Sequence, residues 1–130
     1  MSKIENFIKK WNGKIIEDWG CYCSDEFKSL TRSFRSALKS DLGDEYELIG
    51  FKANHYDFSG FVKRDNHYVY VSYSMNRGLP LDFYGYGNYR EGLLVRTAKH
   101  DKDYTGGMNT YVSFNGLTNH IQKLIVSQAA

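Results

Sequence analysis

The sequence predicts an α+β domain in which helices cover one face of an antiparallel sheet. Two N-terminal segments have helical spacing of apolar residues, and from residue 45 onward the period changes to two, which is typical of strands. Helical spacing returns near the carboxyl end. The predicted architecture is therefore N-terminal helices, a four- to five-stranded antiparallel sheet and a C-terminal helix. The 130 residues fit a single domain, 1–130, which is long enough to bury its own core.

Two amphipathic helices are predicted first. Residues 3–12 carry apolar side chains at helical spacing, and this pattern either ends at Gly13 or continues past it. Residues 24–42 form the strongest helical pattern, with Ser24 as the N-cap and Gly43 as the stop. One apolar stripe runs along this second helix and consists of Phe27, Leu30, Phe34, Leu38 and Leu42.

Alternating apolar residues predict the sheet. The expected strands are 46–54, 58–64, 67–75, 93–98 and 110–114, and a closing helix is expected over 115–127. Asp65 and Asn66 predict a tight turn between the second and third strands. The third strand places Tyr68, Tyr70, Ser72 and Ser74 on one face. Because helices cover the opposite face, we expect these tyrosines to face solvent or a partner.

Composition limits the class of protein. The net charge is only +2, so any basic patch must come from local clustering. Charged residues interrupt the apolar start, and no apolar run approaches the length of a membrane-spanning helix, so we expect a soluble, cytoplasmic protein without membrane contact. Cys21 and Cys23 are expected to be free structural thiols, because two cysteines alone do not make a zinc site.

Charged residues crowd the segment RTAKHDKDYTGGMN, residues 96–109, ahead of a Gly-Gly pair. Neither a phosphate-binding Gly-Lys-Ser/Thr loop nor a His-x-Lys phosphodiesterase motif is completed there. Two interpretations remain open. The segment binds a ligand or partner, with exposed backbone N–H groups and Lys99, His100 and Lys102 available to an anion. Alternatively it is a connecting turn, in which Asp103 or Thr105 bonds nearby backbone.

The sequence favours a protein without enzymatic activity. It has no Gly-x-Ser-x-Gly elbow, and neither cysteine has a catalytic context. Two histidines lie beside carboxylates, in His55-x-Asp57 and His100-Asp101, but nothing in their spacing requires them to meet around a metal. We therefore expect no catalytic residues, no metal and no cofactor.

The second helix carries a basic ridge. Lys28, Arg32, Arg35 and Lys39 recur on one side of it, away from the apolar stripe, and no acidic residue lies between Phe27 and Ser40. Flanking hydroxyls, from Ser29, Thr31, Ser33 and Ser36, could also bond phosphates. This ridge is either a nucleic-acid-binding surface, a contact for an acidic protein surface or an ordinary solvated helix face.

Tyrosines and glycines concentrate in the long segment 76–92, which also holds the only proline. Long loops of this kind are uncommon in compact domains unless they bind something or move. The tyrosines could anchor a protein interface. Base stacking is the alternative, but DFSGFVKR at 57–64 departs from the RNA-binding motif that it partly resembles, at both its first and its last position.

Three stretches, KANHYDFSGF (52–61), YVYVSYS (68–74) and RTAKHDKDYTGG (96–107), resemble small accessory proteins encoded on plasmids, conjugative elements and prophages of Gram-positive bacteria. The resemblance covers most of the chain. It implies a short, non-enzymatic inhibitor of a host defence complex, as anti-CRISPR proteins are. The chain lacks the strongly acidic balance of DNA mimics, so such an inhibitor would act by docking.

Three functional hypotheses follow. The first is docking on a host defence protein or nuclease complex through Tyr84, Tyr86, Tyr89, Arg90, Lys99, His100, Asp103 and Tyr104. The second is nucleic-acid binding through Lys28, Arg32, Arg35 and Lys39. The third is a small-molecule or nucleotide site, or a minor hydrolase, around His100, Asp103 and Gly106-Gly107 in the 99–107 loop.

Overall fold

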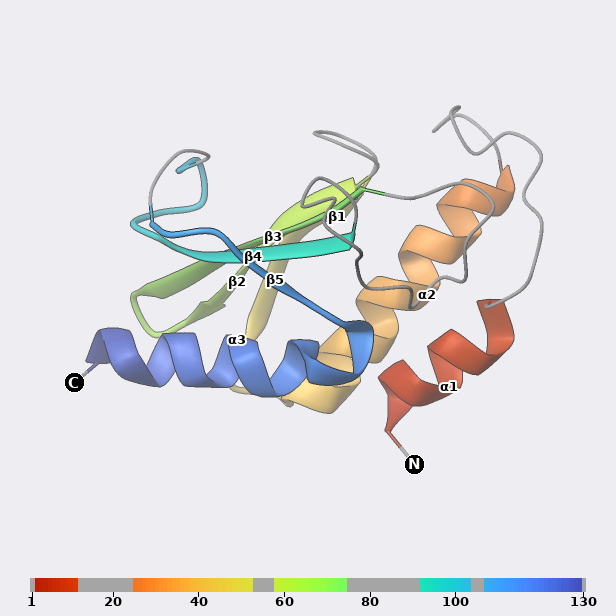
Figure 1. The fold of residues 1–130 in the computed structure, drawn as a ribbon, viewed down its shortest axis with the longest axis horizontal. Coiled ribbons are helices and arrows are strands. Elements are labelled where there is room, and N and C mark those ends of the chain that lie inside the picture. The colour runs from red at the N-terminus through yellow and green to blue at the C-terminus, as the bar shows by residue number, and fades with distance from the viewer. Residues whose placement is uncertain (1, 12–24, 53–57, 75–91, 104–106, 130) are drawn as a thin grey trace.

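A computed structural model describes residues 2–11, 25–52, 58–74, 92–103 and 107–129 (Figure 1). The elements in chain order are α1 (Lys3–Trp11), α2 (Asp25–Leu42), β1 (Glu47–Lys52), β2 (Phe58–Arg64), β3 (His67–Ser74), β4 (Gly92–Ala98), β5 (Thr110–Val112) and α3 (Phe114–Ala129). The predicted α+β class is confirmed, with N-terminal helices, a five-stranded sheet and a C-terminal helix.

The sheet is an antiparallel meander in the order β1-β2-β3-β4-β5. Each strand pairs with the next one along the chain, so the order needs no crossover connection. The predicted turn between β2 and β3 is confirmed, because Arg64 pairs with His67 across Asp65 and Asn66. Asp65 takes a φ of 55°, a left-handed conformation that Asp tolerates better than most residues.

A bulge in β1 changes which side chains reach the core. The register between β1 and β2 shifts between Gly50 and Lys52, so Leu48 and Phe51 both face the helices although they are three residues apart. Across the ladder, a Cβ at Gly60 would lie only 2.6 Å from the backbone nitrogen of Phe51. Glycine at position 60 therefore allows the bulged strand to approach closely.

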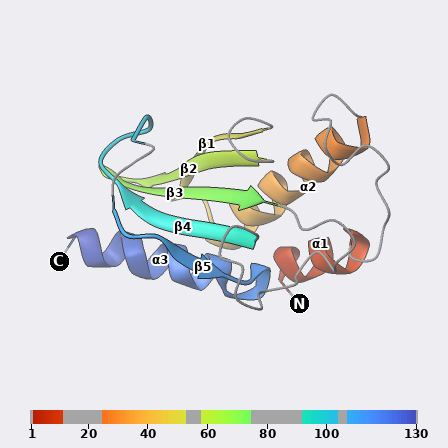
Figure 2. The same ribbon diagram turned by 45° about the horizontal axis from the view of Figure 1, so that its top comes forward.

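All three helices lie on one face of the sheet (Figures 1 and 2). Helix α2 packs against β1, and α3 packs along β3, β4 and β5. Their apolar stripes meet alternate residues of the strands in one large core, at whose centre the Phe34 ring lies 4.9 Å from Phe58 and 5.6 Å from Phe7, between ring centroids. This aromatic packing fixes α1 and α2 relative to the sheet.

The last strand is shorter than predicted. The sequence predicts strand through residue 114, whereas β5 ends at Val112 and Phe114 begins α3. The Ser113 side chain accepts a hydrogen bond from the Gly116 N–H, at 3.3 Å, which is how an N-cap residue starts a helix. The Phe114 ring then packs among the core aromatics, 5.7 Å from Phe34 between centroids.

The second face of the sheet is less exposed than expected. Tyr70 was predicted to face solvent or a partner, but it is only 2% exposed and packs in a small cluster with Phe61, Leu94 and Ala98. The Arg96 guanidinium lies 4.4 Å from the Tyr70 ring centroid, and the Phe61 ring lies 5.1 Å from it. Tyr68 and Tyr111 remain partly buried beside this cluster, so the face is a second core layer at its centre.

Several sequence predictions lie outside the described residues. These are the continuation past Gly13, the Ser24 cap, the two cysteines, His55 and the segment 76–91. Among the residues that the structure describes, no helix is both long and apolar enough to cross a membrane.

Candidate functional site

The charged segment after β4 folds into a turn that uses its own polar groups. Asp103 Oδ2 accepts a hydrogen bond from the Lys99 N–H at 2.9 Å, and His100 Nδ1 accepts one from the Lys102 N–H at 3.1 Å. The Asp103 N–H in turn donates to the carbonyl of His100. Asp103 thus bonds nearby backbone, as the connecting-turn interpretation predicts, and His100 adds a bond that this interpretation did not include.

Gly107 completes the return of the chain toward β5. It takes a φ of 75°, and a Cβ there would lie 2.4 Å from the carbonyl oxygen of Thr97. Only glycine combines that conformation with so close an approach. Tyr104, Thr105 and Gly106 lie outside the described residues, as do Tyr84, Tyr86, Tyr89 and Arg90. Most of the predicted protein-docking contacts are therefore not placed by the structure.

The basic ridge of α2 divides into two kinds of residue. Lys28 and Arg32 are exposed. Arg35 donates from Nη2 to the carbonyl of Leu48 at 2.9 Å, and Lys39 donates from Nζ to the carbonyls of Gly43 and Tyr46. Arg35 and Lys39 therefore tie α2 to β1 and to the chain that leads into it, although neither has a carboxylate within ion-pair distance among the described residues. Their positive charges still lie at the surface.

Helix α1 extends the charged surface alongside α2. Asp41, near the end of α2, accepts hydrogen bonds from the N–H groups of Lys3 and Ile4, both at 2.9 Å. This carboxylate caps α1 and compensates the positive end of its dipole. Since Phe7 also packs on Phe34, α1 runs roughly antiparallel to α2 and directly beside it.

An open groove of about 560 Å³ lies between the two helices. Its cationic lining is Lys3 and Lys10 from α1 and Arg32 from α2, and no carboxylate lines it. A second hollow of about 540 Å³ shares Arg32 and adds Arg35, Lys39 and Asp44. We define the α1/α2 surface as the cations and serines that line the two hollows, together with the exposed Lys28 one helical turn before Arg32. Its members are Lys3, Lys10, Lys28, Arg32, Arg35, Lys39, Ser29, Ser33, Ser36 and Ser40.

Hydroxyl groups line the groove next to the cations. Ser29, Ser33, Ser36 and Ser40 recur along α2 and all contribute to the groove wall. Thr31, which the sequence also suggested, is only 4% exposed and lies on the buried side of α2. Helical spacing explains the burial of Thr31, because position 31 lies on the same apolar face of α2 as Leu38, whereas Ser40 lies on the polar face.

The cations of the α1/α2 surface have no carboxylate partner within the described part of the chain. The one ion pair found there joins Arg64 to Glu45 at 2.8 Å, outside this surface. The Tyr46 hydroxyl, which accepts a hydrogen bond from Arg64, and the Glu45 carboxylate raise the pKa of Arg64 above its ordinary value. Asp41 is occupied by the α1 N-terminus. Asp44 lines the second hollow beside Arg35 and Lys39 but forms no ion pair with them among the described residues. The groove between α1 and α2, which has no carboxylate in its lining, therefore keeps a positive charge that favours anions.

Sequence reasoning missed the contribution of α1. Lys3 and Lys10 are seven residues apart and so fall on one side of their helix, which is the available signal. That this side borders α2 depends on the packing of Phe7 against Phe34, which no local pattern specifies.

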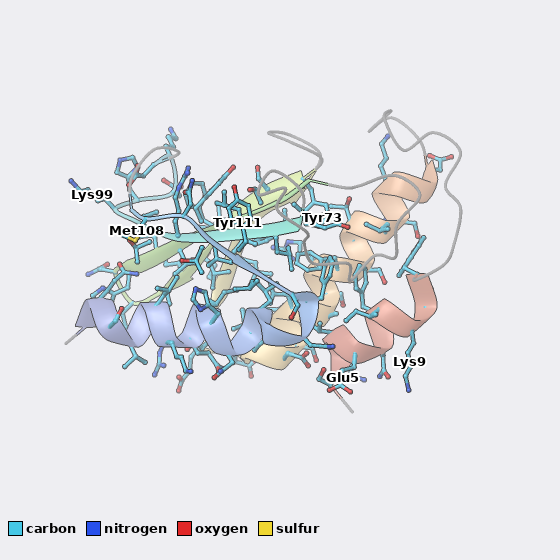
Figure 3. The ribbon with its side chains drawn as sticks, in the orientation of Figure 1. Glu5, Lys9, Tyr73, Lys99, Met108 and Tyr111 are labelled. Carbon is cyan, nitrogen blue, oxygen red and sulfur yellow. The ribbon has the colours of Figure 1, made fainter. Side chains whose placement is uncertain are left out.

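The two predicted regions form separate sites. In Figure 3, Lys99 and Met108 lie at one end of the molecule, and Glu5 and Lys9 of α1 lie at the other. Among the described residues no group of three His, Cys, Asp or Glu side chains could hold a metal ion. No protein-family model, curated protein or solved structure matches the chain.

Proposed function

We propose that this chain is a non-enzymatic binding protein that holds the phosphate backbone of a nucleic acid on its α1/α2 surface. The observation that carries the proposal is a groove with cations on both walls, serine hydroxyls along one of them and no lining carboxylate. Lys, Arg and Ser side chains are the groups that most often position a phosphate backbone.

The spacing of the cations favours a polyanion over a single small anion. Lys28 and Lys39 are eleven residues apart, so the α2 row extends about 16 Å at the helical rise of about 1.5 Å per residue. One strand of a duplex carries a charge about every 3.4 Å of its axis. The row therefore matches several consecutive phosphates, and the α1 lysines add charge across the groove.

The low net charge of the chain is compatible with this proposal. Electrostatic attraction at a surface depends on local clustering, and acidic residues outside the groove between α1 and α2 account for the overall balance of +2. A surface with six cations, two of which also serve as tethers, predicts moderate affinity that salt weakens strongly.

Docking on a host defence complex stays a prediction. Five of its eight expected contact residues lie outside the described part of the chain, and His100 and Asp103 support their own turn. The same two side chains are central to the hypothesis of a nucleotide site in the 99–107 loop. Both side chains already accept hydrogen bonds from backbone N–H groups of the turn, which counts against that hypothesis.

The proposal is tested by titrating a labelled duplex of mixed sequence and following fluorescence anisotropy from about 50 to about 200 mM salt. We expect micromolar-range binding at the lowest salt. The slope of log K against log salt should lie between about −2 and −4, because each neutralised phosphate contributes about −0.9. Absence of binding at low salt, or a slope close to zero, would refute the phosphate-backbone proposal.

A further inference from the structure

The α1/α2 surface, if it binds nucleic acid as proposed, also indicates which form it binds. We infer that the ligand is a nucleic-acid duplex. The protein contacts its phosphates and makes no base-specific contacts. This inference rests on the proposed function and adds the class of nucleic acid and the mode of reading. Three properties of the surface support it: its aromatic residues, its width and its rigidity.

The described aromatic side chains of α1 and α2 face the core. Phe7 is 3% exposed, Trp11 is 8% exposed and Phe34 is fully buried, while the side chain of Phe27 lies outside the described residues. Proteins that prefer single strands stack bases on exposed aromatic rings, which contributes about 1–3 kcal/mol per base. The described aromatic rings of α1 and α2 are therefore not available for stacking, so among the described residues only cations and hydroxyls would attract a single strand.

The surface is too wide to enter the major groove as a unit. Two packed helices have axes about 8–10 Å apart and each is about 10 Å across, so together they span close to 20 Å. The major groove of B-form DNA is about 12 Å wide. Lys3, Lys10 and Arg32 line one groove between the two helices, so they can contact phosphates while the helices stay outside the major groove. Contacts of that kind position a protein but carry no sequence information.

Rigidity favours the duplex further. The core fixes α1 and α2, and Asp41 ties the start of one to the end of the other. A preformed row of cations binds a ligand whose phosphates are already ordered at lower entropic cost than a flexible strand. The duplex also has the higher charge density, which increases the counterion release that drives this type of binding.

The test is a competition experiment at a single low salt concentration. The protein is bound to a labelled mixed-sequence duplex, and the unlabelled competitors are that duplex, a duplex of unrelated sequence and each constituent single strand, matched in phosphate concentration. We expect either duplex to compete at least about tenfold better than either strand. The two duplexes should agree within about threefold, because the contacts are to phosphates.

Single strands that compete as well as the duplex would overturn the inference and leave the proposed function intact. A preference of more than about tenfold for one duplex sequence over the other would overturn the absence of base-specific contacts. Failure of the labelled duplex to bind at all at low salt would overturn the inference together with the proposed function.

Discussion

Replacing Lys28 and Arg32 together with glutamate is expected to weaken duplex binding by at least about 30-fold at low salt. Both side chains are exposed. Among the described residues, no carboxylate lies within ion-pair distance of Lys28 or of Arg32. The double variant removes two phosphate contacts and adds repulsion. Its salt slope should therefore be less steep than that of the unmodified protein by about 2. Fluorescence anisotropy titrations of both proteins measure the two effects.

Folding should be preserved in this variant. Surface substitutions without special contacts change stability by about 0.5 kcal/mol or less, and both side chains are exposed. The matched control replaces Lys102 and Lys123 with glutamate, which changes the net charge equally at exposed positions outside the α1/α2 surface. We expect the control to bind within about threefold of the unmodified protein. Equal losses in both variants would show a non-specific charge effect and contradict the assigned surface.

Replacing Phe34 with alanine is expected to destabilise the fold by about 3–5 kcal/mol. This side chain is fully buried, and its ring lies 4.9 Å from Phe58, 5.6 Å from Phe7 and 5.7 Å from Phe114. Removing the ring leaves a cavity where α1, α2, α3 and β2 meet. The midpoint of thermal unfolding should fall by roughly 10–20 °C, as measured by circular dichroism.

Two further variants make the Phe34 prediction specific. Phe34→Leu retains much of the buried apolar volume and should cost clearly less than Phe34→Ala. Val126→Ala truncates an apolar side chain that is 59% exposed, so it should change stability by about 0.5 kcal/mol or less. If Phe34→Ala were as stable as Val126→Ala, the aromatic core would not be the element that fixes α1 and α2 on the sheet.

Periodicity predicted the elements of the fold because each pattern is local. The stripe of Leu30, Phe34, Leu38 and Leu42 predicts α2, and these four side chains are buried as expected. Alternation predicts β2 over residues 58–64, which are its observed bounds. The strand end at 112 was missed because Ser113 acts as a helix cap, and a Ser followed by Phe also fits a continuing strand.

The candidate site depends on contacts between elements, which the sequence predicts less well. The ridge of Lys28 and Arg32 follows from spacing along one helix. That Arg35 bonds the carbonyl of Leu48, and that Lys3 and Lys10 border the same groove, follows from tertiary packing. Burial of Tyr70 beneath Arg96 has the same origin, since alternation assigns a face but not what covers it.

The measurement that tests the central claim most directly is mapping of amide chemical shifts on isotope-labelled protein as a mixed-sequence duplex is added. The α1/α2 surface predicts that the changes concentrate in residues 3–10 and 28–40, with little change in the 99–103 turn at the opposite end of the molecule. Changes concentrated in the 99–103 turn, with α2 unaffected, would contradict the assignment of the α1/α2 surface as the nucleic-acid-binding site.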